Sequence, residues 1–160
     1  MKLLAILGRG IRRLDEDGPW VLTEDFEVCG PDSGHLPVRI PIEDSNPHCF
    51  VGGGELNILA GMKLLRKFQY DFVVCAYGDR SAYLKSINGP TESEIMSARL
   101  KELTPAAKIE VWPREREMPG PSNTESEVGN ILRFAVAKDI GSVDIVTVTV
   151  HLPRAIVFAA

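Results

Sequence analysis

Short apolar runs alternate with amphipathic helical patterns along most of this chain. The apolar runs, whose β-branched, aromatic and aliphatic residues suit strands, cover residues 3–7, 72–76, 108–111 and 143–150. Apolar residues recur at helical spacing in residues 55–68, 91–103 and 124–138, and a last helix is expected from Pro153. Such alternation is typical of right-handed βαβ units. We therefore predict an α/β fold: a Rossmann-like parallel sheet of about four to five strands flanked by helices.

Residues 8–54 interrupt this alternation. The segment is rich in proline and glycine, and a structureless loop of this length is unusual in a compact domain. Residues 20–28 and 36–42 have strand-like composition and could form a hairpin around residues 29–34. We interpret 8–54 as a small β insertion after the first strand that covers the strand ends, within a single domain spanning residues 1–160.

Composition narrows the class of protein. A length of 160 residues with 44% hydrophobic and 25% charged residues is typical of one globular domain. The net charge of −4 argues against a broad nucleic-acid-binding face, and no apolar run approaches the ~18 residues of a membrane helix. Three cysteines are too few for a disulfide framework and fit a reducing compartment. We expect a cytoplasmic protein with no nucleic-acid or membrane partner.

Glycines and polar residues follow the predicted strands. Ligands of open parallel sheets bind at the carboxyl ends of the strands, where backbone amides, helix N-termini and arginines favour anions. The residues there that we predict to bind a cofactor or small anionic ligand are Gly8, Arg9, Gly10, Gly78, Asp79, Asn123, Thr124 and Arg154. Turn-forming and helix-capping roles remain open for Asp79, Asn123 and Thr124.

Three further residues are candidates for catalysis. Glu94 and Glu127 each end a Thr-Glu-Ser-Glu sequence, a capping box in which the threonine caps the helix and the glutamate reaches back to it. At a pocket mouth, the same carboxylates could act as general bases or metal ligands. His151 follows the last predicted strand and could bind an anion or transfer a proton near neutral pH. The predicted catalytic residues are therefore Glu94, Glu127 and His151.

Other site classes are not expected. Cys29, His35, His48 and Cys49 lack the spacing of a zinc site, so no metal is predicted. The glycines at 52–54 match neither a P-loop nor a dinucleotide fingerprint and suggest a flexible turn before a helix. No Gly-x-Ser-x-Gly sequence is present, which argues against an α/β-hydrolase nucleophile.

Six of these motifs, taken in order, resemble the YdcF/SanA/ElyC-like family. They are LGRG at 7–10, LAGMKLL at 59–65, AYGD at 76–79, ESEIM at 92–96, NTESE at 123–127 and HLPRA at 151–155. The likeness covers residues 1–10 and 52–160. It departs from the family at residues 76–78, where the usual Ser-Gly-Gly is Ala-Tyr-Gly, and at the 8–54 insertion.

The resemblance implies a Rossmann-type domain with a pocket above the strand ends. It also implies a nucleotide-like ligand such as S-adenosylmethionine or a nucleotide, without naming a reaction for the family. Two alternatives stay open: an enzyme performing hydrolysis or group transfer, and a non-catalytic interaction module that uses the 8–54 insertion. The chain ends at Ala160, soon after His151, where the family usually continues. A minimal and a truncated domain both fit, and a second copy filling an unpaired sheet edge is expected.

Overall fold

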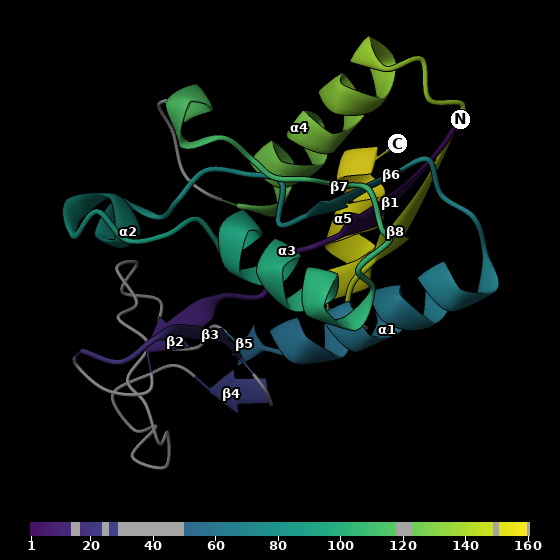
Figure 1. Cartoon of the computed structure of the whole chain (residues 1–160). Helices are drawn as coiled ribbons and strands as arrows, with labels where there is room; N and C mark the ends of the chain where they lie inside the picture. The colour runs from purple at the N-terminus through teal and green to yellow at the C-terminus, as the bar shows by residue number, and fades with distance from the viewer. Residues whose placement is uncertain (14–16, 24–25, 29–49, 118–122, 149–150, 160) are drawn as a thin grey trace.

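The computed structural model describes residues 1–13, 17–23, 26–28, 50–117, 123–148 and 151–159 (Figure 1). Its centre is a parallel sheet in which the strands lie in the order β7-β6-β1-β8. These strands are β1 (Lys2–Ile6), β6 (Phe72–Cys75), β7 (Ile109–Glu110) and β8 (Ser142–Val146). The predicted α/β fold with a Rossmann-like parallel sheet of about four to five strands is thereby confirmed, and the sheet has four strands.

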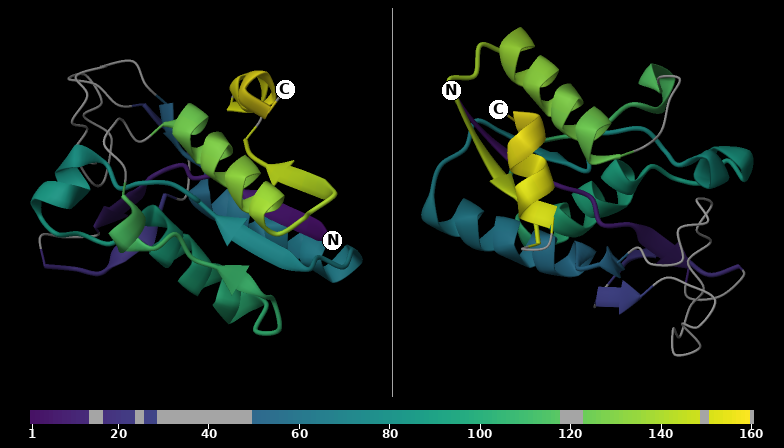
Figure 2. Two further views of the ribbon diagram at one scale, coloured as in Figure 1. Left: turned by 90° about the horizontal axis from the view of Figure 1, so that it is seen from above. Right: turned by 180° about the vertical axis from the view of Figure 1, so that it is seen from behind.

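The sheet is covered by helices on both faces (Figure 2). One face carries α1 (Gly54–Lys67) and α3 (Glu92–Leu103), and the other carries α4 (Thr124–Ala137) and α5 (Leu152–Ala159). Alternate residues of β1 enter the two cores: Leu4 and Ile6 pack in one, Leu3 and Ala5 in the other, and all four are fully buried. Burial on both sides explains why this strand is apolar throughout.

The strand order creates a reversal beside β1. The chain moves outward from β1 to β6 and then to β7, and α4 carries it back to β8 on the far side of β1. The helix that follows β1, α1, covers one face of the sheet, and the helix that follows β8, α5, covers the other. In open α/β sheets this topological switch point, at the carboxyl ends of the strands, is where ligands bind.

The insertion after β1 forms two short antiparallel pairs. β2 (Ile11–Arg13) pairs with β3 (Trp20–Leu22), and β4 (Phe26–Val28) pairs with β5 (Phe50–Gly52). The strand expected over residues 20–28 is thus divided between two pairs. The strand expected over 36–42 and the hairpin expected around 29–34 lie outside the described residues.

Buried Thr23 attaches the insertion to the sheet. Its hydroxyl donates to the carbonyl of Arg9 at 3.2 Å and accepts from the amide of Gly54 at 3.2 Å. Its carbonyl accepts from the amide of Glu55 at 3.0 Å. The glycine turn leading into α1 is also as expected, with Gly53 at φ 82° in the left-handed region that glycine tolerates.

The elements α2 and β8 differ from the sequence prediction. The short helix α2 (Ala82–Ser86), capped by the Ser81 hydroxyl, was not predicted because five residues give no helical periodicity. The strand predicted over 143–150 ends at Val146. Its only described neighbour, β1, ends at Ile6. The amide of Leu7 still donates to the carbonyl of Val146, and beyond this bond the described part of the chain offers β8 no strand to pair with.

Close packing of α1 on β1 depends on a glycine. A Cβ atom at Gly61 would overlap Cδ1 of Ile6. We expect Gly61→Ala to lower the free energy of unfolding by about 1–3 kcal/mol through overpacking. Ile6→Val removes the clashing Cδ1, so the alanine should cost less in that background. Denaturant unfolding of the four proteins of this cycle measures the coupling, and strictly additive losses would contradict the packing argument.

Candidate functional site

The loop after β1 binds two glutamates through its backbone. The amide of Gly8 donates to Oε1 of Glu127 at 2.9 Å. The amides of Arg9 and Gly10 both donate to Oε1 of Glu92, each at 2.5 Å. Three consecutive amides at the carboxyl end of the central strand therefore hold two carboxyl groups side by side.

The two glutamates come from opposite faces of the sheet. Glu92 is the first residue of α3 and Glu127 lies in the first turn of α4, and both helices begin at the carboxyl edge. Gly8 permits the close approach, because a Cβ atom there would lie 2.7 Å from Oε2 of Glu92. The first turns of α3 and α4 therefore meet the end of β1 and Gly8 at the switch point.

The capping of α3 and α4 explains the different positions of the two predicted glutamates. Glu127 accepts from the loop after β1, whereas Glu94 accepts from the start of its own helix. The box of α3 is confirmed: Thr91 Oγ1 accepts from the Glu94 amide at 3.0 Å, and the Glu94 carboxylate accepts from the Thr91 amide at 2.7 Å. The box expected for α4 is wrong. There Asn123 is the N-cap and pairs with Ser126. Asparagine is at least as good a cap as threonine, and this choice shifts the box by one residue and releases Glu127.

Glu94 is therefore occupied at the start of its own helix. Its carboxylate also accepts from Arg114 at 2.8 Å in a partly exposed ion pair. Burial acts in the opposite direction, but the hydrogen bonds from Arg114 and Thr91 hold the pKa of Glu94 below its ordinary value. The glutamate that accompanies Glu127 is Glu92, which the sequence analysis did not select.

Burial makes both carboxyl groups of this pair weak acids. Glu127 is 9% exposed, and its burial, followed by the negative charge of Glu92, raises its pKa to about 8 against the opposing amides of Gly8 and Tyr77. Burial likewise raises the pKa of Glu92, against the amides of Gly10 and Arg9. Two close carboxyl groups cannot both ionise easily, so the pair retains a proton near neutral pH.

A second polar group lies beside the carboxyl pair. Nη1 of Arg9 is 3.2 Å from Nδ1 of His151, and Oγ1 of Thr124 is 2.8 Å from Nε2 of the same ring. Burial, the charge of Arg9 and then that of Arg154 lower the pKa of His151 to about 4. The imidazole is consequently neutral at pH 7, and the positive charges of Arg9 and Arg154 favour an anionic neighbour.

The structure brings together most of the residues singled out from the sequence. Six of them form the cluster just described: Gly8, Arg9, Gly10, Thr124, Glu127 and His151. Gly78 borders it, since a Cβ atom there would lie 3.6 Å from Cα of Glu127. Arg154 is exposed on α5, within electrostatic reach of His151, and Asn123 caps α4.

Asp79 and Arg80, in the loop after β6, have different surroundings from the carboxyl pair. Arg80 donates to Glu117 at 2.5 Å and to the Gly89 carbonyl at 2.8 Å, contacts that tie loops together. Asp79 precedes it in the chain and is half-buried. Among the described residues, no three His, Cys, Asp or Glu side chains are placed to hold a metal ion. Cys29, His35, His48 and Cys49 lie outside those residues.

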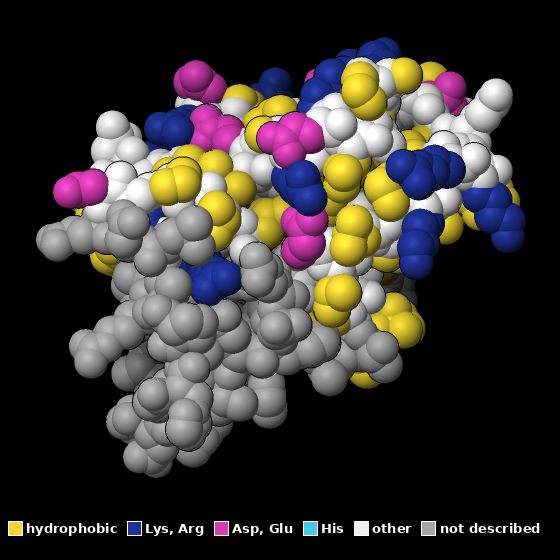
Figure 3. Space-filling model, turned by 60° about the horizontal axis from the view of Figure 1, so that its bottom comes forward, with side chains coloured by type: hydrophobic (Ala, Val, Ile, Leu, Met, Phe, Trp, Pro, Cys, Tyr) yellow, Lys and Arg dark blue, Asp and Glu magenta, His cyan; other side chains and the backbone are white. Residues whose placement is uncertain are grey.

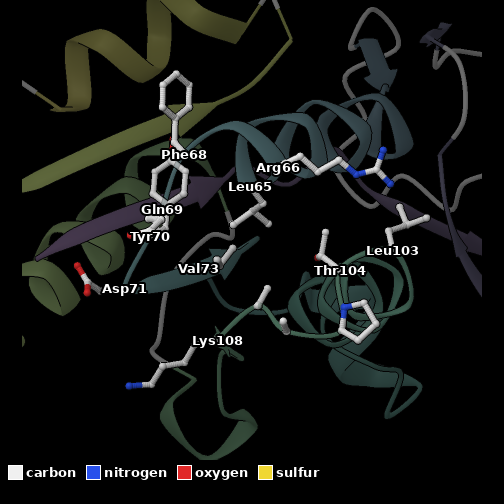
Figure 4. Close-up of a pocket in the computed structure, with 13 residues that line it drawn as sticks. Leu65, Arg66, Phe68, Gln69, Tyr70, Asp71, Val73, Leu103, Thr104 and Lys108 are labelled. Carbon is white, nitrogen blue, oxygen red and sulfur yellow. The ribbon is translucent and has the colours of Figure 1, made fainter.

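A hollow of about 730 Å³ opens at the other edge of the sheet. It lies between the carboxyl-terminal ends of α1 and α3, with Leu65 and Val73 at its centre and Arg66 and Lys108 at its margins (Figure 4). On the underside of the molecule, hydrophobic side chains are interspersed with charged ones of both signs (Figure 3). The hollow is at the amino ends of β6 and β7 and is not part of the carboxyl-pair site.

Comparison with protein families, curated proteins and solved structures finds no match to this chain. The resemblance to the YdcF-like family accordingly rests on its motifs. Within the described part of the chain, no helix combines the length and the apolar character needed to cross a lipid bilayer.

Proposed function

We propose that the carboxyl edge of the sheet binds a small molecule, and that Glu92 and Glu127 exchange a proton with it in a hydrolysis or group-transfer reaction. One observation carries this proposal: the carboxyl groups of buried Glu127 and half-buried Glu92, from two helices, accept hydrogen bonds from three consecutive amides at the switch point of the sheet. A carboxyl group with a pKa near neutrality is suited to general acid–base catalysis.

We infer the ligand class from the family resemblance. If the chain is YdcF-like, the first candidates are nucleotides and S-adenosylmethionine. An anionic part of such a ligand would face Arg9 and Arg154, because the Gly8–Gly10 amides already bind carboxyl groups. The proposal includes a cytoplasmic location and a second copy added along β8, whose described neighbour is β1 alone.

A thermal-shift screen tests the binding step. Adenosine 5′-monophosphate, S-adenosylmethionine and glucose 6-phosphate are compared, and a compound at 100 times its dissociation constant should stabilise the protein by about 2.7 kcal/mol. Glu127→Gln should reduce that gain, whereas Glu125→Gln, an exposed position in the same helical turn, should preserve it. Absence of any shift with all three compounds would exclude them as ligands and remove the support for a nucleotide-like class.

Calorimetry tests the proton exchange. Binding enthalpies at pH 7 measured in two buffers of different ionisation enthalpy give the number of protons taken up or released. We expect a non-zero number for the wild type and a value near zero for Glu127→Gln, because glutamine cannot titrate. Binding without proton uptake or release in the wild type would instead favour a ligand-binding role without acid–base chemistry.

A further inference from the structure

The imidazole of His151 connects two polar side chains from different elements. Arg9, in the loop after β1, contacts Nδ1, and Thr124, in the first turn of α4, contacts Nε2. The ring is half-buried and Thr124 is 5% exposed. Both nitrogens of the ring therefore have partners on the protein.

The chemistry of the partners fixes the direction of both hydrogen bonds. A guanidinium group has five N–H donors and no acceptor, so Nδ1 must accept from Arg9. A neutral imidazole whose Nδ1 accepts carries its proton on Nε2. That N–H donates to Oγ1 of Thr124, and the hydroxyl proton of Thr124 is then directed to a different acceptor.

We propose that His151 is a positioning residue of this site, held by Arg9 as the Nε2–H tautomer, and that it orients the Thr124 hydroxyl as a hydrogen-bond donor to an acceptor oxygen of the ligand. The ligand part of this inference rests on the proposed function, whereas the tautomer does not. Carbonyl, hydroxyl and phosphate oxygens are suitable acceptors. On this view His151 does not transfer the proton, and the acid–base chemistry belongs to the carboxyl pair.

The charges around the ring support a neutral imidazole. Arg9 faces it from the loop after β1 and Arg154 from α5, and both positive charges oppose its protonation. Across the ring, α4 contributes the uncharged Thr124. Glu127, on the same helix, bonds to the Gly8 amide, and Glu92 bonds to the amides of Arg9 and Gly10. Among the described residues, no carboxylate contacts the ring.

Nitrogen NMR of the unliganded full chain tests the tautomer. The protein has three histidines, and comparison with His151→Gln assigns the His151 signals in a long-range ¹H–¹⁵N spectrum. We expect protonated Nε2 and unprotonated Nδ1 from pH 5.5 to pH 8. An Nδ1–H tautomer, or a doubly protonated ring in this range, would overturn the proposal.

Matched variants separate positioning from a merely structural role. Arg9→Met should give a mixture of the two tautomers, while Arg154→Met should keep the Nε2–H form. Thr124→Ser keeps the hydroxyl and should retain affinity for the three compounds of the screen, whereas Thr124→Val should lose about tenfold. Equal affinity of Thr124→Val and the wild type would exclude the donor role. Failure of all three compounds to bind would instead count against the proposed function, with the tautomer measured independently.

Discussion

Replacing Glu127 by glutamine is expected to raise the free energy of unfolding at pH 8 and to remove much of its decline between pH 5 and pH 8. The cause is the buried position of this carboxyl group beside Glu92, which raises its pKa from the ordinary value of 4.5 to about 8. A neutral amide of similar shape avoids the cost of ionisation while its oxygen still accepts from the Gly8 amide.

The direction of the effect follows from proton linkage. In the unfolded chain Glu127 releases its proton near pH 4.5, whereas in the folded protein it retains the proton up to about pH 8. Between these values the folded state binds more protons, so stability falls as pH rises, by at most about 1.4 kcal/mol per pH unit. Over the whole interval the loss is on the order of 4–5 kcal/mol. Glu92, whose pKa is also raised, contributes in the same direction and remains in the variant.

Chemical denaturation at several pH values between 4.5 and 8.5 measures this difference. The control is Glu125→Gln, which changes an exposed glutamate two residues away and should follow the wild-type curve. Parallel curves for wild type and Glu127→Gln would contradict the prediction. They would mean that the amides of Gly8 and Tyr77 hold an ionised carboxylate in the folded protein.

The sequence was sufficient to predict the sheet and the helices that cover it. β1 and β6 are apolar on both faces, and α1, α3 and α4 have apolar residues at helical spacing, so local pattern and tertiary burial agree. Among the elements that escaped prediction, α2 depends on the Ser81 cap rather than on periodicity, and β2 and β5 have only three residues each. Where pattern and packing give the same answer, the pattern is enough.

The candidate site was harder to predict, because it depends on helix register. Asn123 and Thr124 are both good caps, and a shift of one residue decides whether Glu127 closes a capping box or turns toward β1. In α3 the box uses Glu94 and leaves Glu92 at the first helical position, directed at the loop after β1. Once Glu94 is assigned to the capping box of α3, Glu92 is the glutamate of that turn that remains available for a site. Its partners, however, are backbone amides of a distant segment, which no local pattern reveals.

Gly8→Ala is expected to have the other large effect, because it displaces the Glu92 carboxyl group from its place. A Cβ atom at residue 8 would lie 2.7 Å from Oε2, 2.8 Å from Cδ and 2.9 Å from Oε1 of Glu92. Oε1 is held by the amides of Arg9 and Gly10, so the carboxyl group cannot retreat without losing both hydrogen bonds. We expect a loss of about 2–4 kcal/mol in the free energy of unfolding.

Gly78→Ala is the matched control for this substitution. Gly78 also follows a sheet strand at the same edge, but its added Cβ would lie 3.6 Å from Glu127, an ordinary contact. Gly78→Ala should therefore be close to neutral. In a Glu92→Ala background the cost of Gly8→Ala should largely disappear, because the group it strikes is gone. A loss at residue 8 that is as small as the loss at residue 78, or that persists without Glu92, would show that the glutamate is not held against β1. With the carboxyl pair separated, Gly8→Ala should also abolish the proton uptake or release that accompanies ligand binding.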